Sequence, residues 1–368
     1  MKIWMQKDLF RTGIGVALAA LVLFVLAPAM LSDFRLNLLA KFLCLAMVSV
    51  GIGLAWGRGG MLTLGQGIYF GLGAYMMAMH LKLADAGPGG VPDFMLLYGT
   101  GEVPSWWEPF RSPVVTIILI LLLPPLVAGV LGLAIFKRKV KGAYFAILSQ
   151  AMAAAFAILL IGQQQVTGGT NGLNRFHSFF GFDLADPVNK RMLYFIAAGV
   201  LLVLVLGVRQ LMHSRYGELL VAVRDQEERV RFLGYDPAIV KTVAYMIAAL
   251  TASVGGALFV PIVGIISPSD VGVVPSIAFL IGVAIGGRAT LLGPVLGAIG
   301  VSWAQTSLSE SFPSGWIYFQ GLLFVVVIAF LPGGIAQVFK YFKDLKAKKT
   351  KKTVESANTK GTEEVVNV

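Results

Sequence analysis

Long apolar runs alternate with short polar segments along nearly the whole chain. A membrane core about 30 Å thick is crossed by roughly 20 apolar residues in a helix, and ten runs approach this length. They lie at residues 12–31, 36–56, 61–83, 113–136, 143–162, 192–212, 242–264, 272–288, 291–309 and 316–339. The pattern predicts an all-α, polytopic membrane protein with about ten transmembrane helices.

The parity of these helices favours an internal repeat. Ten helices divide into two sets of five, and an odd number in each half gives the halves opposite orientations in the membrane. No sequence repeat is visible by eye. The five-plus-five inverted repeat is therefore predicted from the helix count alone.

Charge gives the bundle an orientation. Only 13 % of the 368 residues are charged, and the net charge is +11. The Lys and Arg residues gather between apolar runs, as the positive-inside rule describes, so the charge does not indicate nucleic-acid binding. Placing segments 137–141, 214–241 and 340–352 in the cytoplasm puts both termini there and leaves loops 84–112 and 163–191 outside. A lipid membrane is thus the expected surrounding.

We divide the chain into a transmembrane domain, residues 1–345, and a tail, residues 346–368. The tail begins with basic residues, continues with polar ones and has no apolar period. Such composition cannot bury enough apolar surface to fold. We therefore expect a disordered cytoplasmic tail.

The charged segment, residues 214–241, carries both signs of charge between two membrane-length apolar runs. Asp225 and Glu228 have the spacing of a reciprocal helix cap, which predicts a helix over 226–233. At 1.5 Å per residue this helix is about 12 Å long. A helix so short is not stable alone, so it needs support from this chain or from a partner. A solvated loop is the alternative.

Local signals also define the end of this helix. Gly234 stands where a helix stops in the left-handed conformation. Asp236 followed by Pro237 has the pattern of a new cap with proline at the first helical position. A second helix is therefore predicted to begin at residue 237.

Neutral polar residues inside apolar runs are candidates for a substrate path, because an unpaired polar group in hydrocarbon is costly. Glycines crowd the sequence TLGQGIYFGLGAY at 63–75, where close helix packing explains them as well as a path does. The turn-rich TGGTNGL at 167–173 is either a plain loop or an outer vestibule. The candidate path residues are Gln66, Tyr69, Gln150, Thr170 and Asn171.

Charged residues near the membrane are few. Lys41 and Arg288 lie near predicted helix ends, so we expect them to extend toward the membrane surface. No Asp, Glu or Arg occupies the middle of a predicted helix. An ion-coupled transport cycle therefore has no evident carboxylate.

Several chemistries have no motif here. The sequence contains no Gly-x-x-x-x-Gly-Lys-Ser/Thr loop that would cradle phosphates. His80, His177 and His213 do not cluster, and Cys44 is the lone cysteine. We expect no catalytic activity, no metal and no cofactor.

Five motifs together resemble the branched-chain amino acid permease family of ABC importers. They are TLGQGIYFGLGAY, KGAYFAILSQAMA at 141–153, TGGTNGL, RYGELLVAVRDQEERVRFLGYD at 215–236 and GGRATLLGPVLGA at 286–298. The resemblance covers roughly residues 35–340. It implies a permease subunit in a bacterial-type plasma membrane, working with a second related permease, two ABC ATPases and an extracytoplasmic binding protein.

The same resemblance makes residues 214–241 the segment that couples to the ATPases, by docking in a groove of an ATPase. The coupling residues that it implies are Arg215, Gly217, Arg224, Asp225, Glu227, Arg229 and Gly234.

Within the family, four stretches look like the urea permease branch. They are RDQEERVRFLGYDP at 224–237, VPIVGIISPSD at 260–270, GFDLADP at 181–187 and the aromatic loop 93–110. A neutral, hydrogen-bonding path suits urea, although it would also pass an amino acid zwitterion or a short-chain amide. An ATP-independent channel is a further alternative, but a channel has no need of a charged segment with helix caps.

Overall fold

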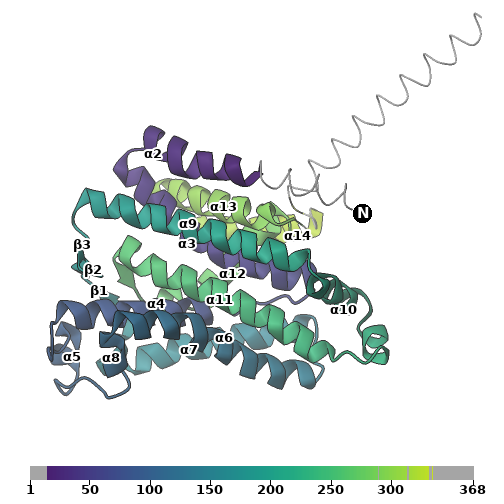
Figure 1. The fold of residues 1–368 in the computed structure, drawn as a ribbon, viewed down its shortest axis with the longest axis horizontal. Coiled ribbons are helices and arrows are strands. Elements are labelled where there is room, and N and C mark those ends of the chain that lie inside the picture. Colours follow the sequence, from purple (N-terminus) through teal and green to yellow (C-terminus); the bar gives the residue numbers. More distant parts are fainter. Residues whose placement is uncertain (1–14, 289, 313–314, 331–333, 335–368) are drawn as a thin grey trace, which may run out of the picture.

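The computed structural model describes residues 15–288, 290–312, 315–330 and 334. Long helices run side by side along the horizontal direction of Figure 1, and short strands lie at one end of the bundle. The third basic segment, residues 340–352, the tail, residues 346–368, and both termini lie outside the described residues. The all-α prediction agrees with this helical bundle.

The elements have the following bounds. The longer helices are α3 (Asp33–Ile52), α4 (Gln66–Asp85), α6 (Pro113–Lys137), α7 (Ala143–Gly162), α9 (Pro187–Met212), α10 (Arg215–Phe232), α11 (Pro237–Val263), α12 (Val273–Gly286), α13 (Leu292–Ser311) and α14 (Trp316–Phe330). The shorter ones are η1 (Val22–Leu26), α2 (Ala27–Met30), η2 (Gly53–Arg58), α5 (Asp93–Tyr98), η3 (Glu108–Arg111), α8 (Gln164–Thr167), η4 (Gly169–Asn171) and η5 (Pro268–Asp270). The strands are β1 (Leu173–Asn174), β2 (Ser178–Phe179), β3 (Phe182–Asp183) and β4 (Ile265–Ile266).

Each of the ten predicted ranges overlaps a helix. Among the described residues, six helical stretches are long and apolar enough to cross a membrane: Asp33–Arg58, Pro113–Lys137, Ala143–Gly162, Pro187–Met212, Pro237–Val263 and Pro268–Gly286. The other four ranges hold α4, α13, α14 and the shorter apolar helix Gly15–Met30. A polytopic membrane protein is therefore supported, whereas ten crossings and the repeat stay predictions.

Helices α3, α4 and α11 form the centre of the bundle. In their most apolar windows, 78 % of Asp33–Arg58 and 72 % of Pro237–Val263 are buried, against 28 % for α6 and for α7. Glycines let the central helices approach: a Cβ on Gly73 would collide with the carbonyl oxygen of Ser253, and one on Gly256 with that of Phe70. Close packing thus accounts for part of the glycine-rich motif, while α6 and α7 present apolar side chains outward.

Two stretches between the long helices bring the starts of α4 and α12 together inside the bundle. Residues 59–65 precede α4, and residues 264–272 precede α12. The backbone N–H of Gly67 donates to the Ser276 hydroxyl at 3.1 Å. These helices are the third predicted span of each half, and interrupted helices in corresponding positions are what an inverted repeat produces.

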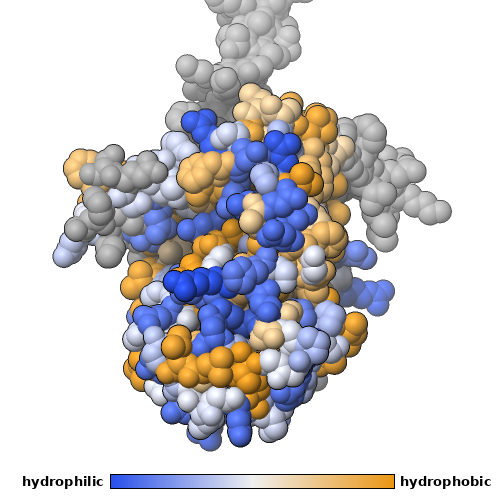
Figure 2. Space-filling view, turned by 90° about the vertical axis from the view of Figure 1, so that its left-hand side faces the viewer, coloured by the Kyte–Doolittle hydropathy of each residue, from blue (hydrophilic) through white to orange (hydrophobic). Residues whose placement is uncertain are grey.

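The loops sort to opposite ends of the bundle. The loop end holds residues 84–112, 163–191 and 264–272, where β1 pairs antiparallel with β4, and β2 with β3 (Figure 1). Figure 2 looks onto this end, and hydrophilic residues gather around the centre of the face. The basic end holds residues 137–141 and α10, which are joined by an ion pair from Lys141 to Glu227. Two of the three predicted basic segments therefore share one end, as expected.

Candidate functional site

The charged segment folds as a kinked helix, α10, followed by the start of α11. Ser214 caps α10 by accepting from the N–H of Gly217 at 3.4 Å. Gln226 has φ −148° and ψ 67°, which are not helical, so α10 is two short pieces in tandem. The predicted short helix exists, but it begins after Gln226 and ends at Phe232.

The predicted cap from Asp225 and Glu228 is wrong. Asp225 instead accepts two hydrogen bonds from the neighbouring Arg224, at 2.7 and 3.2 Å. Glu228 pairs with Arg231 at 3.1 Å. A guanidinium offers two charge-assisted bonds to a carboxylate, and these are stronger than a bond from a neutral backbone N–H.

The signals at the end of the segment are confirmed. Gly234 has φ +88°, the left-handed conformation that glycine adopts without strain. Asp236 accepts from the N–H of Ala238 at 2.9 Å, and Pro237 is the first residue of α11. A sharp turn therefore separates the two helices and points residues 232–235 away from the bundle, where all four are exposed.

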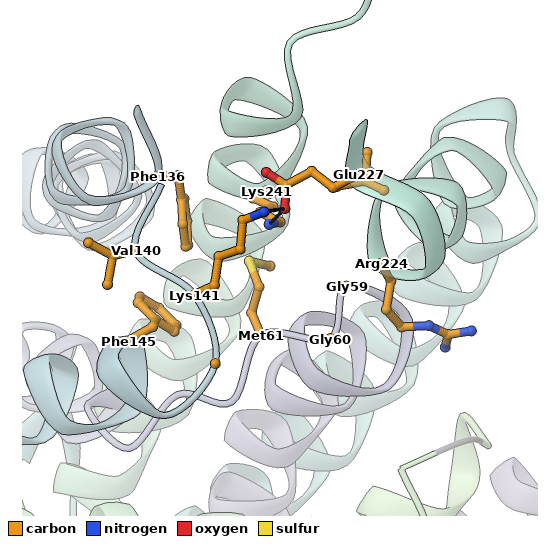
Figure 3. Close-up of a pocket in the computed structure, with 12 residues that line it drawn as sticks. Gly59, Gly60, Met61, Phe136, Val140, Lys141, Phe145, Arg224, Glu227 and Lys241 are labelled. Atoms are coloured by element: carbon orange, nitrogen blue, oxygen red, sulfur yellow. Dashed lines mark hydrogen bonds and ion pairs between the residues drawn. The ribbon is translucent and has the colours of Figure 1, made fainter. Parts of the chain in front are cut away.

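Glu227 anchors the second piece of α10 to the rest of the protein. Figure 3 shows the ammonium groups of Lys241 and Lys141 beside the same oxygen of its carboxylate, at 2.8 and 2.9 Å. Arg231 approaches the other carboxylate oxygen at 3.4 Å. The Glu227 side chain is only 14 % exposed and that of Lys241 only 11 %. One carboxylate thus ties α10 to the segment before α7 and to the first turn of α11.

The pKa of Glu227 records the competition between burial and its cationic neighbours. Burial alone would raise this pKa, but hydrogen bonds and charge from Lys241 and Lys141 outweigh burial and lower it below the usual value. Glu227 is therefore ionised at neutral pH. Ionised, it can hold both lysines at once.

Arg224 provides a second attachment. It donates to the carbonyl oxygen of Gly57 at 2.8 Å and so joins the first piece of α10 to the end of η2. Gly60, with φ +67°, packs directly against the Arg224 side chain. Gly60 and Arg224, with Lys141 and Glu227, line a cavity of about 160 Å³ at the basic end (Figure 3).

The remaining predicted coupling residues divide by exposure. Arg215 and Arg229 are exposed, so they are free to meet another surface. Gly217 is buried, and a Cβ there would collide with the carbonyl oxygen of Met212. Gly217 therefore serves the tight junction between α9 and α10.

The sequence reasoning missed an apolar tip at the end of α10. Phe232 is 90 % exposed, Leu233 76 % and Tyr235 54 %. Large apolar side chains gathered at the aqueous end of a membrane protein indicate a contact surface. The signal was present in the sequence, since an apolar pair and an aromatic residue surround the helix stop at Gly234. Lys141 and Lys241, the partners of Glu227, were missed as well.

The five candidate path residues lie in different places. Gln66 and Tyr69 are buried at the start of α4, and Gln150 is half-buried in α7. Thr170 and Asn171 are exposed at the loop end. Neither amide atom of Gln66 has a hydrogen-bond partner among the described residues. No hydrogen bond joins any two of the five among the described residues, and the path stays a prediction.

A bundle of long apolar helices, with a charged segment at one end, defines the class: a polytopic membrane protein. Residues 34–331 match the model of a family described as branched-chain amino acid transport system / permease component. The chain belongs to this family of permeases, which are transport subunits of ABC importers. Permease components of ABC importers work with ATPase subunits and a binding protein.

Two relatives of this chain have the same name. The high-affinity branched-chain amino acid transport system permease protein LivM of Escherichia coli K12 is 26 % identical over 341 residues, covering 86 % of this chain and 73 % of the relative. The protein of that name from Salmonella typhimurium LT2 is 25 % identical, with the same coverage. No solved structure matches this chain.

Proposed function

We propose that this chain is the permease subunit of an ATP-driven importer of urea and that the charged segment docks on the ATPases. The observation that supports coupling most directly is the exposed apolar tip, Phe232, Leu233 and Tyr235, at the end of a helix that the partly buried Glu227 anchors to the rest of the chain. A channel would have no use for such a surface.

The mechanism follows from the attachment of α10. A partner that moves the tip pulls on Glu227, and through Lys141 and Lys241 it pulls on the starts of α7 and α11. Helix α11 packs in the centre of the bundle against α4. Movement at the basic end would therefore reach the bundle centre and alternate its outward and inward openings.

The assembly that we propose has a second related permease, two ATPases and an extracytoplasmic binding protein. The basic end faces the cytoplasm, because the positive-inside rule assigns it there. The loop end then faces the binding protein, and both termini are cytoplasmic in a bacterial-type plasma membrane. Cysteine labelling from outside, in a Cys44→Ala background, should modify residues 90–108 and 175–188; labelling at 218–232 instead would reverse this orientation.

Urea as the solute is supported by the sequence of the charged segment, the loop end and residues 260–270. The relatives are named for branched-chain amino acids, which makes a branched-chain amino acid importer the second candidate. A short-chain amide is a third candidate.

Uptake of radiolabelled urea and leucine separates these candidates. Cells lacking this gene should lose urea uptake and keep leucine uptake, and the gene supplied in trans should restore urea uptake. Loss of leucine uptake with urea uptake intact would move the protein to the amino acid branch. Urea uptake that depends on the gene but survives ATP depletion would favour a channel.

A further inference from the structure

A second cavity, of about 170 Å³, lies between α3, α4, α12, α13 and α14. It is remote from the charged segment, and none of the five predicted path residues lines it. Its wall combines aromatic side chains with Lys41, Asp270, Gln305 and Gln320. The polar groups come from helices far apart in sequence and gather at one place inside an otherwise apolar bundle.

Lys41 is the first unusual group. It is the ninth residue of α3, about 12 Å along the axis from Asp33, and Asp33 lies at the loop end, paired with Arg191 at 2.6 Å. The Lys41 side chain is half-buried and lines the cavity; its extension toward the membrane surface stays a prediction. No ion pair or hydrogen bond is made by Lys41 to any residue that the structure describes. Lys41 lies in a helix long and apolar enough to cross a membrane, and an unpaired cation in such a helix is a mark of a functional site.

Asp270 is the second unusual group in the cavity wall. One of its carboxylate oxygens, Oδ2, accepts from the backbone N–H and the hydroxyl of Ser267, at 3.0 and 2.8 Å. These bonds fix the carboxylate in the short helix η5. Within the described chain no bond reaches the other oxygen, Oδ1. Asp270 is thus held in place with one acceptor free.

Gln320 supplies an independent indication of a ligand. Its side chain is 6 % exposed, and its Nε2 has no hydrogen-bond partner among the described residues. Buried polar atoms in folded proteins nearly always have a partner, so an orphaned donor that lines a cavity points to a molecule bound there. Gln305, an exposed residue of α13, also lines the cavity and adds a second amide.

Three aromatic rings close part of the cavity wall. Phe70 of α4 contacts Phe259 of α11 and Phe279 of α12, with ring centroids 5.2 and 5.5 Å apart. All three line the cavity. Phe70 and Phe259 belong to α4 and α11, two helices that pack in the bundle centre, so a movement that reaches these helices reaches this wall.

We propose that this cavity is the solute site of the permease and that it holds one urea molecule. This inference rests on the proposed function. Urea has one carbonyl oxygen and four N–H groups. The Lys41 ammonium and the Gln320 amide donate to the carbonyl, and Asp270 Oδ1 accepts from one N–H, as does the Gln305 amide oxygen. An apolar lipid chain would leave the buried Gln320 amide without a partner, which is costly.

The complete complex in proteoliposomes, supplied with its binding protein, tests the site through radiolabelled urea uptake and ATP hydrolysis. Lys41→Met and Asp270→Asn each remove one charged partner and should lower uptake about tenfold or more, the scale of a hydrogen bond to a charged group. Stimulation of ATP hydrolysis by the binding protein should persist. Lys41→Arg and Asp270→Glu, which keep the charges, should retain more uptake. The matched controls are Lys190→Met and Glu102→Gln, both at exposed positions.

A cysteine provides a second measurement that does not depend on removing a charge. Gln305→Cys in a Cys44→Ala background, labelled by a small thiol reagent, should lose urea uptake because the adduct fills the cavity. Normal uptake after complete labelling would overturn the site.

The outcomes separate the two proposals. Wild-type complex that moves urea, with both charge variants at wild-type rates, overturns the cavity and leaves the proposed function standing. Wild-type complex that moves leucine and no urea overturns the proposed solute, whatever the variants do. Variants that move urea poorly but hydrolyse ATP normally, beside intact controls, support the site.

Discussion

The two ends of the bundle are held in different ways. At the loop end, side chains form hydrogen bonds with the backbone of neighbouring loops. Asp85 accepts from the N–H groups of His177 and Ser178, at 2.8 and 3.1 Å. It also accepts from the Ser178 hydroxyl at 2.8 Å. Arg111 donates to the carbonyl oxygens of Gly87 and Gly90, at 3.1 and 2.9 Å. Such bonds fix the course of the chain.

At the basic end, the second piece of α10 is held by side-chain ion pairs that converge on Glu227 and by Val230, its one buried apolar side chain. Exposed ion pairs contribute little, so the polar part of the attachment depends on the one partly buried carboxylate. The difference teaches that the loop end is a preformed platform, suited to receive another protein. At the basic end, the second piece of α10 has few attachments and is suited to move.

Reversing the charge of Glu227 should have the largest effect. Glu227→Lys places a third cation beside Lys141 and Lys241, which should weaken the attachment of α10 by about 3 kcal/mol, the scale of a broken buried pair. ATP-driven uptake should be lost, while membrane insertion continues. Glu228→Lys is the matched control, because that side chain is 64 % exposed. Equal loss of uptake in both variants would show that the overall charge of α10 matters, and not the ion pairs of Glu227.

Removing the Asp85 carboxylate should affect the loop end and leave the attachment of α10 at the basic end intact. Asp85→Ala leaves the N–H groups of His177 and Ser178 without their acceptor, a cost of about 2 kcal/mol. Stimulation by the binding protein should fall severalfold, and ATPase subunits should still co-purify. Glu102→Ala, in the same loop region, serves as control. Loss of ATPase association in Asp85→Ala would contradict the separation of the two ends.

The response to pH should distinguish the anchor from an ordinary exposed carboxylate. The pKa of Glu227 is lowered in the folded protein, so its ion pairs are complete above the unfolded pKa, near 4.3. They are lost only as the pH falls through the lower, folded value. Association with the ATPases should therefore hold steady from pH 8 to about 5. A loss centred near pH 6 would assign the dependence to another group.

The smallest effect is expected at the turn after α10. Gly234 has φ +88° and an ideal Cβ would meet nothing within 4 Å, so Gly234→Ala introduces backbone strain without a clash. The cost should be about 1 kcal/mol, and Gly234→Asn should cost less. Faster amide hydrogen exchange over 227–235 in Gly234→Ala, with unchanged exchange in α4, would confirm this. Unchanged exchange in the turn would show that Gly234 has no conformational role.

The sequence predicted what depends on neighbouring residues. The apolar runs marked the helices, and Gly234 and Asp236 marked where the charged segment turns and where α11 begins. Asp225 misled the interpretation because the guanidinium of the adjacent Arg224 binds its carboxylate more strongly than a backbone N–H does.

What the sequence could not predict is which distant residues meet. Lys241 lies 14 residues from Glu227 and could have been suspected, but Lys141 reaches Glu227 only because α7 and α11 begin at the same end. Lys41 and Asp270 line one cavity although more than half of the chain separates them. Such contacts are set by helix packing and leave no periodic signal.

The central claim is that the tip of α10 contacts an ATP-hydrolysing subunit. A photo-crosslinking amino acid in place of Phe232, whose side chain is 90 % exposed, tests this directly in membranes that contain the whole transporter. Irradiation should join this chain to an ATPase subunit, and the same probe at Glu102, at the loop end, should join it to none. Cross-linking from Phe232 to lipid or to the external binding protein alone would contradict the account.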